Sequence, residues 1–230
     1  MTRKDFDSIP SLAPFNPLDK RNLGQSVFVA LTQQPFVPMV DIKPFKGAGV
    51  YAVYYTGSDV LYKGIEPVYA NQERPIYVGK AVPTGARKGN LGLDAEPGLV
   101  LYNRLKEHSE SIIAADNLRI EDFRCRFLAV DDIWIPLAES LLITTYSPLW
   151  NVIIEGFGNH DPGKGRVNQQ KSVWDVLHPG RTWATKLRDN NLTELVIRRK
   201  IQDWSVNQKR SLSSKVLEKD STIGKQNSTE

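Results

Sequence analysis

A run of seven strand-forming residues, GVYAVYY at positions 49–55, limits the folds open to this chain more than any other feature. Valine and tyrosine favour extended backbone, and seven residues is an ordinary strand length. Two further segments of this kind follow, RPIYV at 74–78 and FRCRFLAV at 123–130. The first two are joined by a Gly-containing connection that is too long for a tight turn. The sequence therefore predicts a small antiparallel sheet of three strands.

One helix is predicted before the third strand in the sequence and another after it. Between 99 and 114 an apolar stripe recurs at helical spacing, and His108 falls on the same line. A second helix is expected from Pro136 to Tyr146, because proline is favoured in a first turn and Pro148 then stops the helix. A short helix is also possible at 25–33. Together these elements predict an α+β fold.

Four regions follow from the composition. Residues 1–46 are rich in proline and read as an arm laid over the core, and 47–155 form the core itself. Residues 156–206 are expected to form a basic extension, a candidate for contacting DNA, and the polar tail 207–230 is expected to be disordered. From Glu155 to Arg210 there are eleven Lys and Arg against six Asp and Glu, a surplus of five in a chain whose net charge is +4. This surplus is compatible with phosphate binding, although ordinary surfaces carry similar charge.

Several protein classes are disfavoured. No run of 18 apolar residues exists, so no membrane span is expected, and the first seven residues lack the apolar stretch of a signal peptide. Cys125 is the only cysteine, which excludes an internal disulfide and fits a reducing cytosol. We therefore expect a cytoplasmic protein.

Glu139 is the clearest anomaly. It is the only acid or base, tyrosine apart, between Ile133 and Ile154. A charge in a largely buried helix costs several kcal/mol, roughly, unless it is paired or binds a metal. The ordinary interpretation is an ion pair with a basic neighbour. The functional one is a magnesium ligand, since Mg²⁺ needs few protein ligands and keeps several waters.

Arg104 and His108 are four residues apart, so their side chains project from the same helix face. Arginine can hold a phosphate in two hydrogen bonds, and histidine can relay a proton near neutral pH. Nearby Glu107 supports the ordinary alternative of surface charges beside a half-buried histidine. Tyr51 and Tyr77 each lie in a predicted strand and would stand near one another if these strands pair.

These residues together resemble the GIY-YIG nucleases. Gly49-Val50-Tyr51 and Tyr77-Val78-Gly79-Lys80 resemble the paired GIY and YIG motifs, with valine in place of isoleucine in each. An arginine and a histidine on the next helix, a later glutamate and then an asparagine complete the family's order. The positions that match are Tyr51, Tyr77, Arg104, His108, Glu139 and Asn151. The resemblance covers about residues 47–155.

Two segments outside that module resemble the type II restriction enzymes of this superfamily that cut the palindrome CCGCGG. They are GFGNHDPG at 156–163 and WDVLHPGR at 174–181. The long connection between the two tyrosine motifs resembles that branch as well. The resemblance implies a bacterial restriction-modification enzyme that acts on double-stranded DNA as a homodimer, since a palindromic site mirrors two-fold symmetry, with a higher oligomer also possible.

The resemblance also implies a mechanism. Glu139 would hold Mg²⁺ at the scissile phosphate, Arg104 would neutralise developing charge, and Tyr51 would orient or deprotonate water. His108 and Tyr77 would be hydrogen-bonded around that water, and Lys80 would lower a phenol pKa. Asn151 would fix a phosphate or the surroundings of the glutamate, or alternatively cap a helix. Candidates for contacting DNA are Arg87, Lys88, Lys164, Arg166 and Arg181.

Three rival interpretations remain open at this stage. A catalytically inactive DNA-binding relative would keep the fold but lose one of the matched residues, and none is missing. A zinc-type nuclease could use His160, Asp161 and His178, although few ligands are present for a closed site. A repair or homing-type nuclease is disfavoured because nothing resembles the additional domains of those enzymes.

Overall fold

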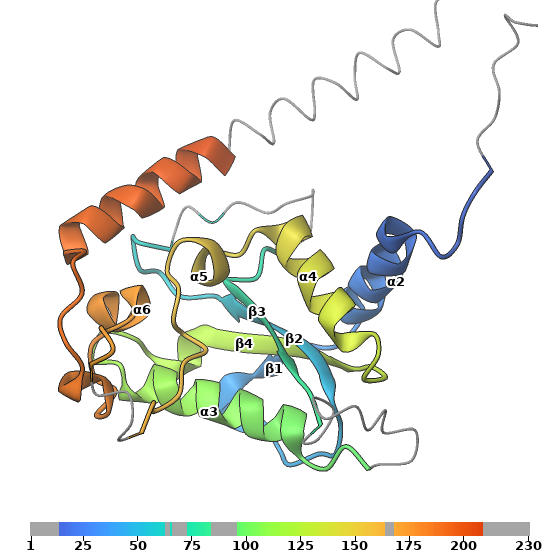
Figure 1. Cartoon of the computed structure of the whole chain (residues 1–230), viewed down its shortest axis with the longest axis horizontal. Helices are drawn as coiled ribbons and strands as arrows, with labels where there is room; N and C mark the ends of the chain where they lie inside the picture. Colours follow the sequence, from blue (N-terminus) through green and yellow to red (C-terminus); the bar gives the residue numbers. More distant parts are fainter. Residues whose placement is uncertain (1–13, 63–64, 66–72, 84–95, 164–167, 209–230) are drawn as a thin grey trace, which may run out of the picture.

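The computed structural model describes residues 14–62, 65, 73–83, 96–163 and 168–208. Its centre is an antiparallel sheet with the strand order β1-β4-β2-β3 (Figure 1). The strands are β1 (Val37–Pro38), β2 (Gly49–Tyr55), β3 (Tyr77–Ala81) and β4 (Phe123–Ala129). The α+β class and the antiparallel pairing are confirmed, but the predicted number of three strands is wrong.

The fourth strand comes from the region predicted to be only an arm. Val37 pairs with Cys125 and Pro38 with Arg124, which places β1 at the edge of the sheet beside β4. Proline is tolerated at such an edge because it has no N–H to donate to the ladder. The same region contains helix α2 (Lys20–Thr32) and a 3-10 turn at Met39–Asp41. Helix α2 begins five residues earlier than the predicted 25–33.

Strand β2 lies at the centre of the sheet and is buried on both faces, which explains why its sequence is apolar throughout rather than alternating. Tyr51 and Val53 face one core cluster together with Leu105. Val50 and Ala52 face a second cluster on the opposite side. The sequence prediction of β2 was correct at both ends, whereas β3 begins three residues later than the predicted 74–78.

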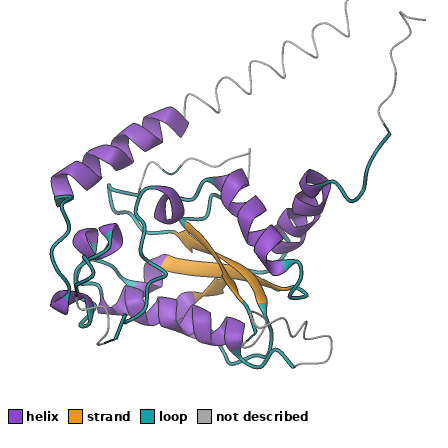
Figure 2. Ribbon diagram, viewed as in Figure 1, coloured by secondary structure: helices purple, strands orange, loops and turns teal. Residues whose placement is uncertain are grey.

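Two long helices cover the two faces, as Figures 1 and 2 show. Helix α3 (Val100–Ala114) packs on the side of the first cluster, and α4 (Ile135–Tyr146) lies with α2 on the other side. Both agree with the sequence prediction to within one residue. Helix α4 ends where Ser147 adopts the left-handed conformation with φ of 44°, directly before Pro148.

The described part of the basic extension packs against the core. It contains α6 (Val173–Leu177), a 3-10 turn at Ala184–Lys186 and a helix over 194–208. Trp174, Ile197 and Trp204 belong to the same cluster as Leu105 of α3. Burial of these apolar side chains fixes the extension against the α3 side of the molecule.

Within the described residues, no helix is both long enough and apolar enough to cross a membrane.

Candidate active site

Tyr51 and Tyr77 lie on one face of the sheet with their ring centroids 6.2 Å apart. Strand pairing places Tyr51 opposite Gly79 and Tyr77 opposite Val53, so the two phenols are diagonal neighbours. A Cβ atom at position 79 would overlap the Tyr51 phenol. Glycine is therefore needed in the YVG segment, because the Tyr51 side chain crosses directly over it.

His108 completes this aromatic group from helix α3. Its Nε2 atom lies 2.6 Å from the Tyr51 hydroxyl, and its ring is about equally close to both tyrosines, with centroid distances of 5.3 and 5.2 Å. Burial lowers the pKa of His108 well below its usual value, and the Arg104 cation lowers it further. His108 is therefore neutral at physiological pH and can accept the hydrogen bond of Tyr51.

Both phenols are protonated at physiological pH. Burial raises the pKa of Tyr51 well above 10, and Tyr77 adds to the rise, while Arg104 opposes it. Burial also raises the pKa of Tyr77, again against the effect of Arg104. The sequence analysis assigned this stabilising charge to Lys80. In the structure Arg104 is the cation that lowers the tyrosine pKa values. The ammonium of Lys80 is paired with Glu139 instead.

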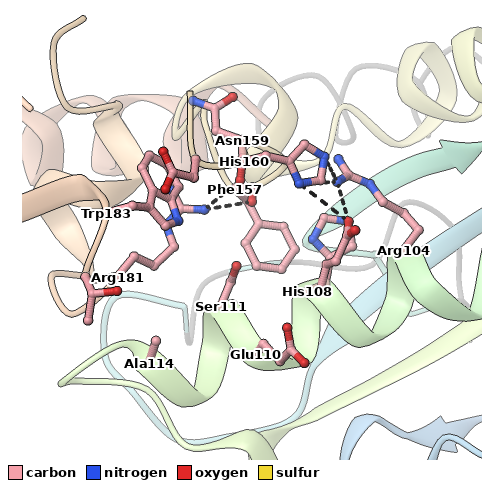
Figure 3. Close-up of a pocket in the computed structure, with 13 residues that line it drawn as sticks. Arg104, His108, Glu110, Ser111, Ala114, Phe157, Asn159, His160, Arg181 and Trp183 are labelled. Atoms are coloured by element: carbon pink, nitrogen blue, oxygen red, sulfur yellow. Dashed lines mark hydrogen bonds and ion pairs between the residues drawn. The ribbon is translucent and has the colours of Figure 1, made fainter. Parts of the chain in front are cut away.

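Arg104 is held by several acceptors. Its Nη1 donates to Glu107 Oε2 at 3.0 Å and contacts His160 Nε2, and its Nη2 donates to the carbonyl of Gly158 at 2.8 Å. The side chain is 19% exposed, so part of the guanidinium is accessible. A pocket of about 310 Å³ opens beside it, between α3 and the segments 157–161 and 181–183 (Figure 3).

Glu139 forms an ion pair with Lys80, with 2.6 Å between Oε2 and Nζ. Its side chain is 22% exposed, because α4 buries only the stripe formed by Ile135, Ala138, Leu142 and Tyr146. The premise that a charge lies inside a largely buried helix is thus only partly correct. The charge of the carboxylate nevertheless contributes to raising the pKa values of both Tyr51 and Tyr77.

The donor set around Glu139 fits magnesium better than a metal with many protein ligands. No group of three or more His, Cys, Asp or Glu side chains that could hold a metal ion is found in the described ranges. A hard cation that keeps its waters and takes a substrate phosphate needs little more than one ionised carboxylate. Glu139, paired with Lys80 and partly exposed, meets this requirement.

The side chain of Asn151 is hydrogen-bonded to the backbone of strand β3. It lies in the short helix α5 (Leu149–Val152), and its side-chain amide pairs with the backbone of Val78. Oδ1 accepts from Val78 N and Nδ2 donates to Val78 O, both at 2.8 Å. The amide thus continues the hydrogen bonding of the sheet at the outer edge of β3, between Tyr77 and Gly79. It positions the second tyrosine motif and does not cap a helix.

The family model of the Eco29kI GIY-YIG domain matches residues 43–205, which is more than half of the chain. The chain belongs to this family. It is a GIY-YIG nuclease of a restriction enzyme family, and its substrate is DNA. No curated protein matches the chain. The matched segment extends beyond the resemblance at 47–155 and includes most of the basic extension, which agrees with the packing of that extension on the GIY-YIG core.

The predicted DNA contacts of this GIY-YIG protein are only partly visible. Arg87, Lys88, Lys164 and Arg166 lie outside the described residues. Arg181 is described, and its position contradicts a DNA-contacting role, since its side chain is 2% exposed. It forms a 2.7 Å ion pair with Asp175 and donates to the carbonyls of Gly156, Phe157 and Asn159. Arg181 therefore holds the loop that follows α5.

The zinc-type alternative is wrong for the described residues. His178 is buried and lies between Tyr62 and Asn117, with Asn117 Oδ1 at 2.8 Å from its Nδ1. Burial lowers the pKa of His178 to about 3, so this histidine stays neutral within a hydrogen-bonded core network. His160 is 60% exposed and contacts Arg104.

The sequence analysis did not identify the residues that surround Arg104 and His108. Phe157 stacks on His108 with a centroid distance of 4.4 Å and an angle of 18°, and Gly158 supplies a carbonyl to Arg104. Both lie in the GFGNHDPG segment, which the sequence analysis had used for the family resemblance and for the zinc-type alternative. The glycines at 156 and 158, so close to His160 in the sequence, were the available indication of a tightly packed loop.

Proposed function

We propose that the protein is a type II restriction endonuclease that hydrolyses both strands of DNA within a short palindrome, CCGCGG by resemblance, with Mg²⁺ bound at Glu139. The observation that carries the proposal is the hydrogen bond between Tyr51 and the neutral His108. This pair lies beside Arg104 on one face of the sheet, and Glu139 comes from helix α4, which covers the opposite face. A restriction enzyme meets its substrate inside the bacterial cell, so the proposal places the protein in the cytoplasm.

The chemistry starts from the phosphodiester. Arg104 is positioned to hold a non-bridging oxygen through charge-assisted hydrogen bonds, which favours the transition state because negative charge grows there. A water attacks the phosphorus, the bond to the 3′ oxygen breaks, and the leaving oxygen takes up a proton from solvent. Magnesium, when bound at Glu139, neutralises charge on the phosphate and on the leaving oxygen.

The proton of the attacking water passes to the Tyr51 oxygen while the phenol proton passes to His108 Nε2. Transfer through the pair avoids a free tyrosinate, which burial makes costly. The low pKa of His108 in the DNA-free state is due in part to the Arg104 cation. A bound phosphate offsets that cation and so makes His108 a stronger base when substrate is present.

Tyr51→Phe is expected to slow single-turnover cleavage by about 100-fold or more, the usual contribution of general acid–base catalysis. DNA affinity should change by less than about two-fold, because the ring and its packing remain. The measurement is single-turnover cleavage at saturating enzyme. Tyr54→Phe is a matched control, since Tyr54 lies in the same strand but in the core cluster of the opposite face. Equal rates for the two variants would contradict the relay.

The proposed function is tested by digesting DNA of known sequence in magnesium and mapping both ends of each product. Discrete fragments with one shared sequence at every end support a restriction enzyme, and CCGCGG at each end supports the specific target. Random nicking would indicate a repair-type or nonspecific nuclease. A palindromic site also requires two copies of the catalytic site, so sedimentation of the protein–DNA complex should show a dimer on one site.

A further inference from the structure

The loop at 156–160 lies across helix α3 and contacts the two residues proposed for catalysis there. Phe157 stacks on the ring of His108, and the carbonyl of Gly158 accepts from Arg104 Nη2. His160, at the end of the loop, places its Nε2 atom against Arg104 Nη1 (Figure 3). The loop also contacts the sheet, since the rings of Phe157 and Tyr77 lie 4.9 Å apart.

The chemistry of this contact determines which ring nitrogen of His160 carries the hydrogen. A guanidinium has only donors, so the imidazole nitrogen that faces it must be the one with the lone pair. The other nitrogen, Nδ1, lies 3.6 Å from Glu107 Oε2, where a hydrogen is electrostatically favourable. Glu107 itself accepts from the same Nη1 atom at 3.0 Å. His160 and Glu107 thus share Arg104 Nη1 between them, while Gly158 engages Nη2.

We infer that His160 is a positioning residue, which fixes the plane of the Arg104 guanidinium toward the scissile phosphate before DNA binds. The inference rests on the proposed role of Arg104 in catalysis. An arginine held on two nitrogens loses less conformational freedom when it binds phosphate, and its donors are already oriented toward the charge that develops. His160 acts through Arg104 and does not itself need to touch the substrate.

The support for the loop explains why an exposed histidine can act in this way. Arg181 donates to three backbone carbonyls of the loop, and its own Nε is paired with Asp175. Asp175 is held in turn by the hydroxyl of Ser172 at 2.6 Å. Both charged side chains of the pair are 2% exposed. The backbone that carries His160 is therefore anchored in the protein interior, although its side chain is 60% exposed.

The test compares three substitutions of His160. In His160→Gln the amide oxygen can occupy the place of Nε2, in His160→Asn it reaches only the place of Nδ1, and His160→Ala removes both. Because the contact with Arg104 uses Nε2, His160→Gln should keep cleavage within about three-fold of the unaltered protein. His160→Asn and His160→Ala should slow single-turnover cleavage by about 10- to 100-fold, the range expected for a misplaced catalytic group. Affinity for cognate DNA, measured with calcium in place of magnesium, should stay within about two-fold for all three.

Other results would overturn the inference in distinguishable ways. Weaker DNA binding with an unchanged rate at saturating enzyme would make His160 a DNA contact. Equal slowing of all three variants would mean that the imidazole itself is required for the chemistry. If His160→Ala cleaves normally while Arg104→Ala is inactive, only the positioning role fails. If Arg104→Ala also cleaves normally, the proposed function of the site fails with it.

Discussion

Glu139→Gln is expected to abolish DNA cleavage in magnesium, with a loss of at least about 1,000-fold in the single-turnover rate, since a metal contributes several kcal/mol of transition-state stabilisation. Glutamine has nearly the same shape, so the packing of α4 beside Ala138 and Leu142 is retained. What is removed is the negative charge that a hard cation requires. Binding to cognate DNA should be retained or slightly strengthened, because one carboxylate that repels phosphate is lost.

The ion pair with Lys80 provides the necessary control. Glu139→Gln breaks this pair as well as the proposed metal site, so the two effects must be separated. Lys80→Gln breaks the same pair and keeps the carboxylate, and its loss of rate should be much smaller, about ten-fold, because a partly exposed pair contributes little by itself. Glu121→Gln, at an exposed glutamate that pairs only weakly with Arg119, should cleave normally. Retained cleavage by Glu139→Gln, at any magnesium concentration, would exclude this carboxylate as the metal ligand.

Arg181→Met is expected to lower the free energy of unfolding by about 3–5 kcal/mol, as for other buried ion pairs that lose one partner. Asp175 would be left as an unpaired charge in the interior, and the loop carbonyls at 156, 157 and 159 would lose their donor. The measurement is urea unfolding of the full chain. Cleavage should also slow in conditions where the variant is folded, because the loop that contacts Arg104 and His108 loses its anchor.

Two comparisons make the result for Arg181 decisive. Lys171→Met removes a more exposed ion pair with Asp189 in the same extension, and it should cost less than about 1 kcal/mol. The double variant Arg181→Met with Asp175→Leu should recover part of the stability, since no unpaired charge remains. If Arg181 instead contacted DNA, the single substitution would weaken DNA affinity and leave the urea midpoint unchanged.

The elements with strong local patterns were predictable from the sequence. The aromatic run of β2, the apolar stripe of α3 and the prolines that bracket α4 each fix local structure through residues a few positions apart. Strand β1 was not predictable in this way. It has only two residues, Val37 and Pro38, and becomes a strand through pairing with β4, more than 80 positions later in the chain.

The residues of the candidate site also fall into those that the sequence could identify and those whose roles depend on the tertiary structure. Tyr51, Tyr77, Arg104, His108 and Glu139 were found because residue types and their order carry the family resemblance. The roles of Lys80, Asn151 and Arg181 depend on which partner lies against them in space. Lys80 pairs with Glu139, the Asn151 amide pairs with the backbone of Val78, and Arg181 is buried beneath the loop. No spacing within the sequence contains that information.

The sequence by itself thus determined the sheet's central strand, the two covering helices and the identity of the residues that match the nuclease motif, because these depend on short-range periodicity and residue chemistry. Only the tertiary structure decided that the extension shares the core of the nuclease domain and that its loop at 156–160 contacts Arg104 and His108. The physical reason is that burial and hydrogen bonding between distant segments set the charge state and orientation of each side chain, and these neighbours are chosen by packing rather than by position along the chain.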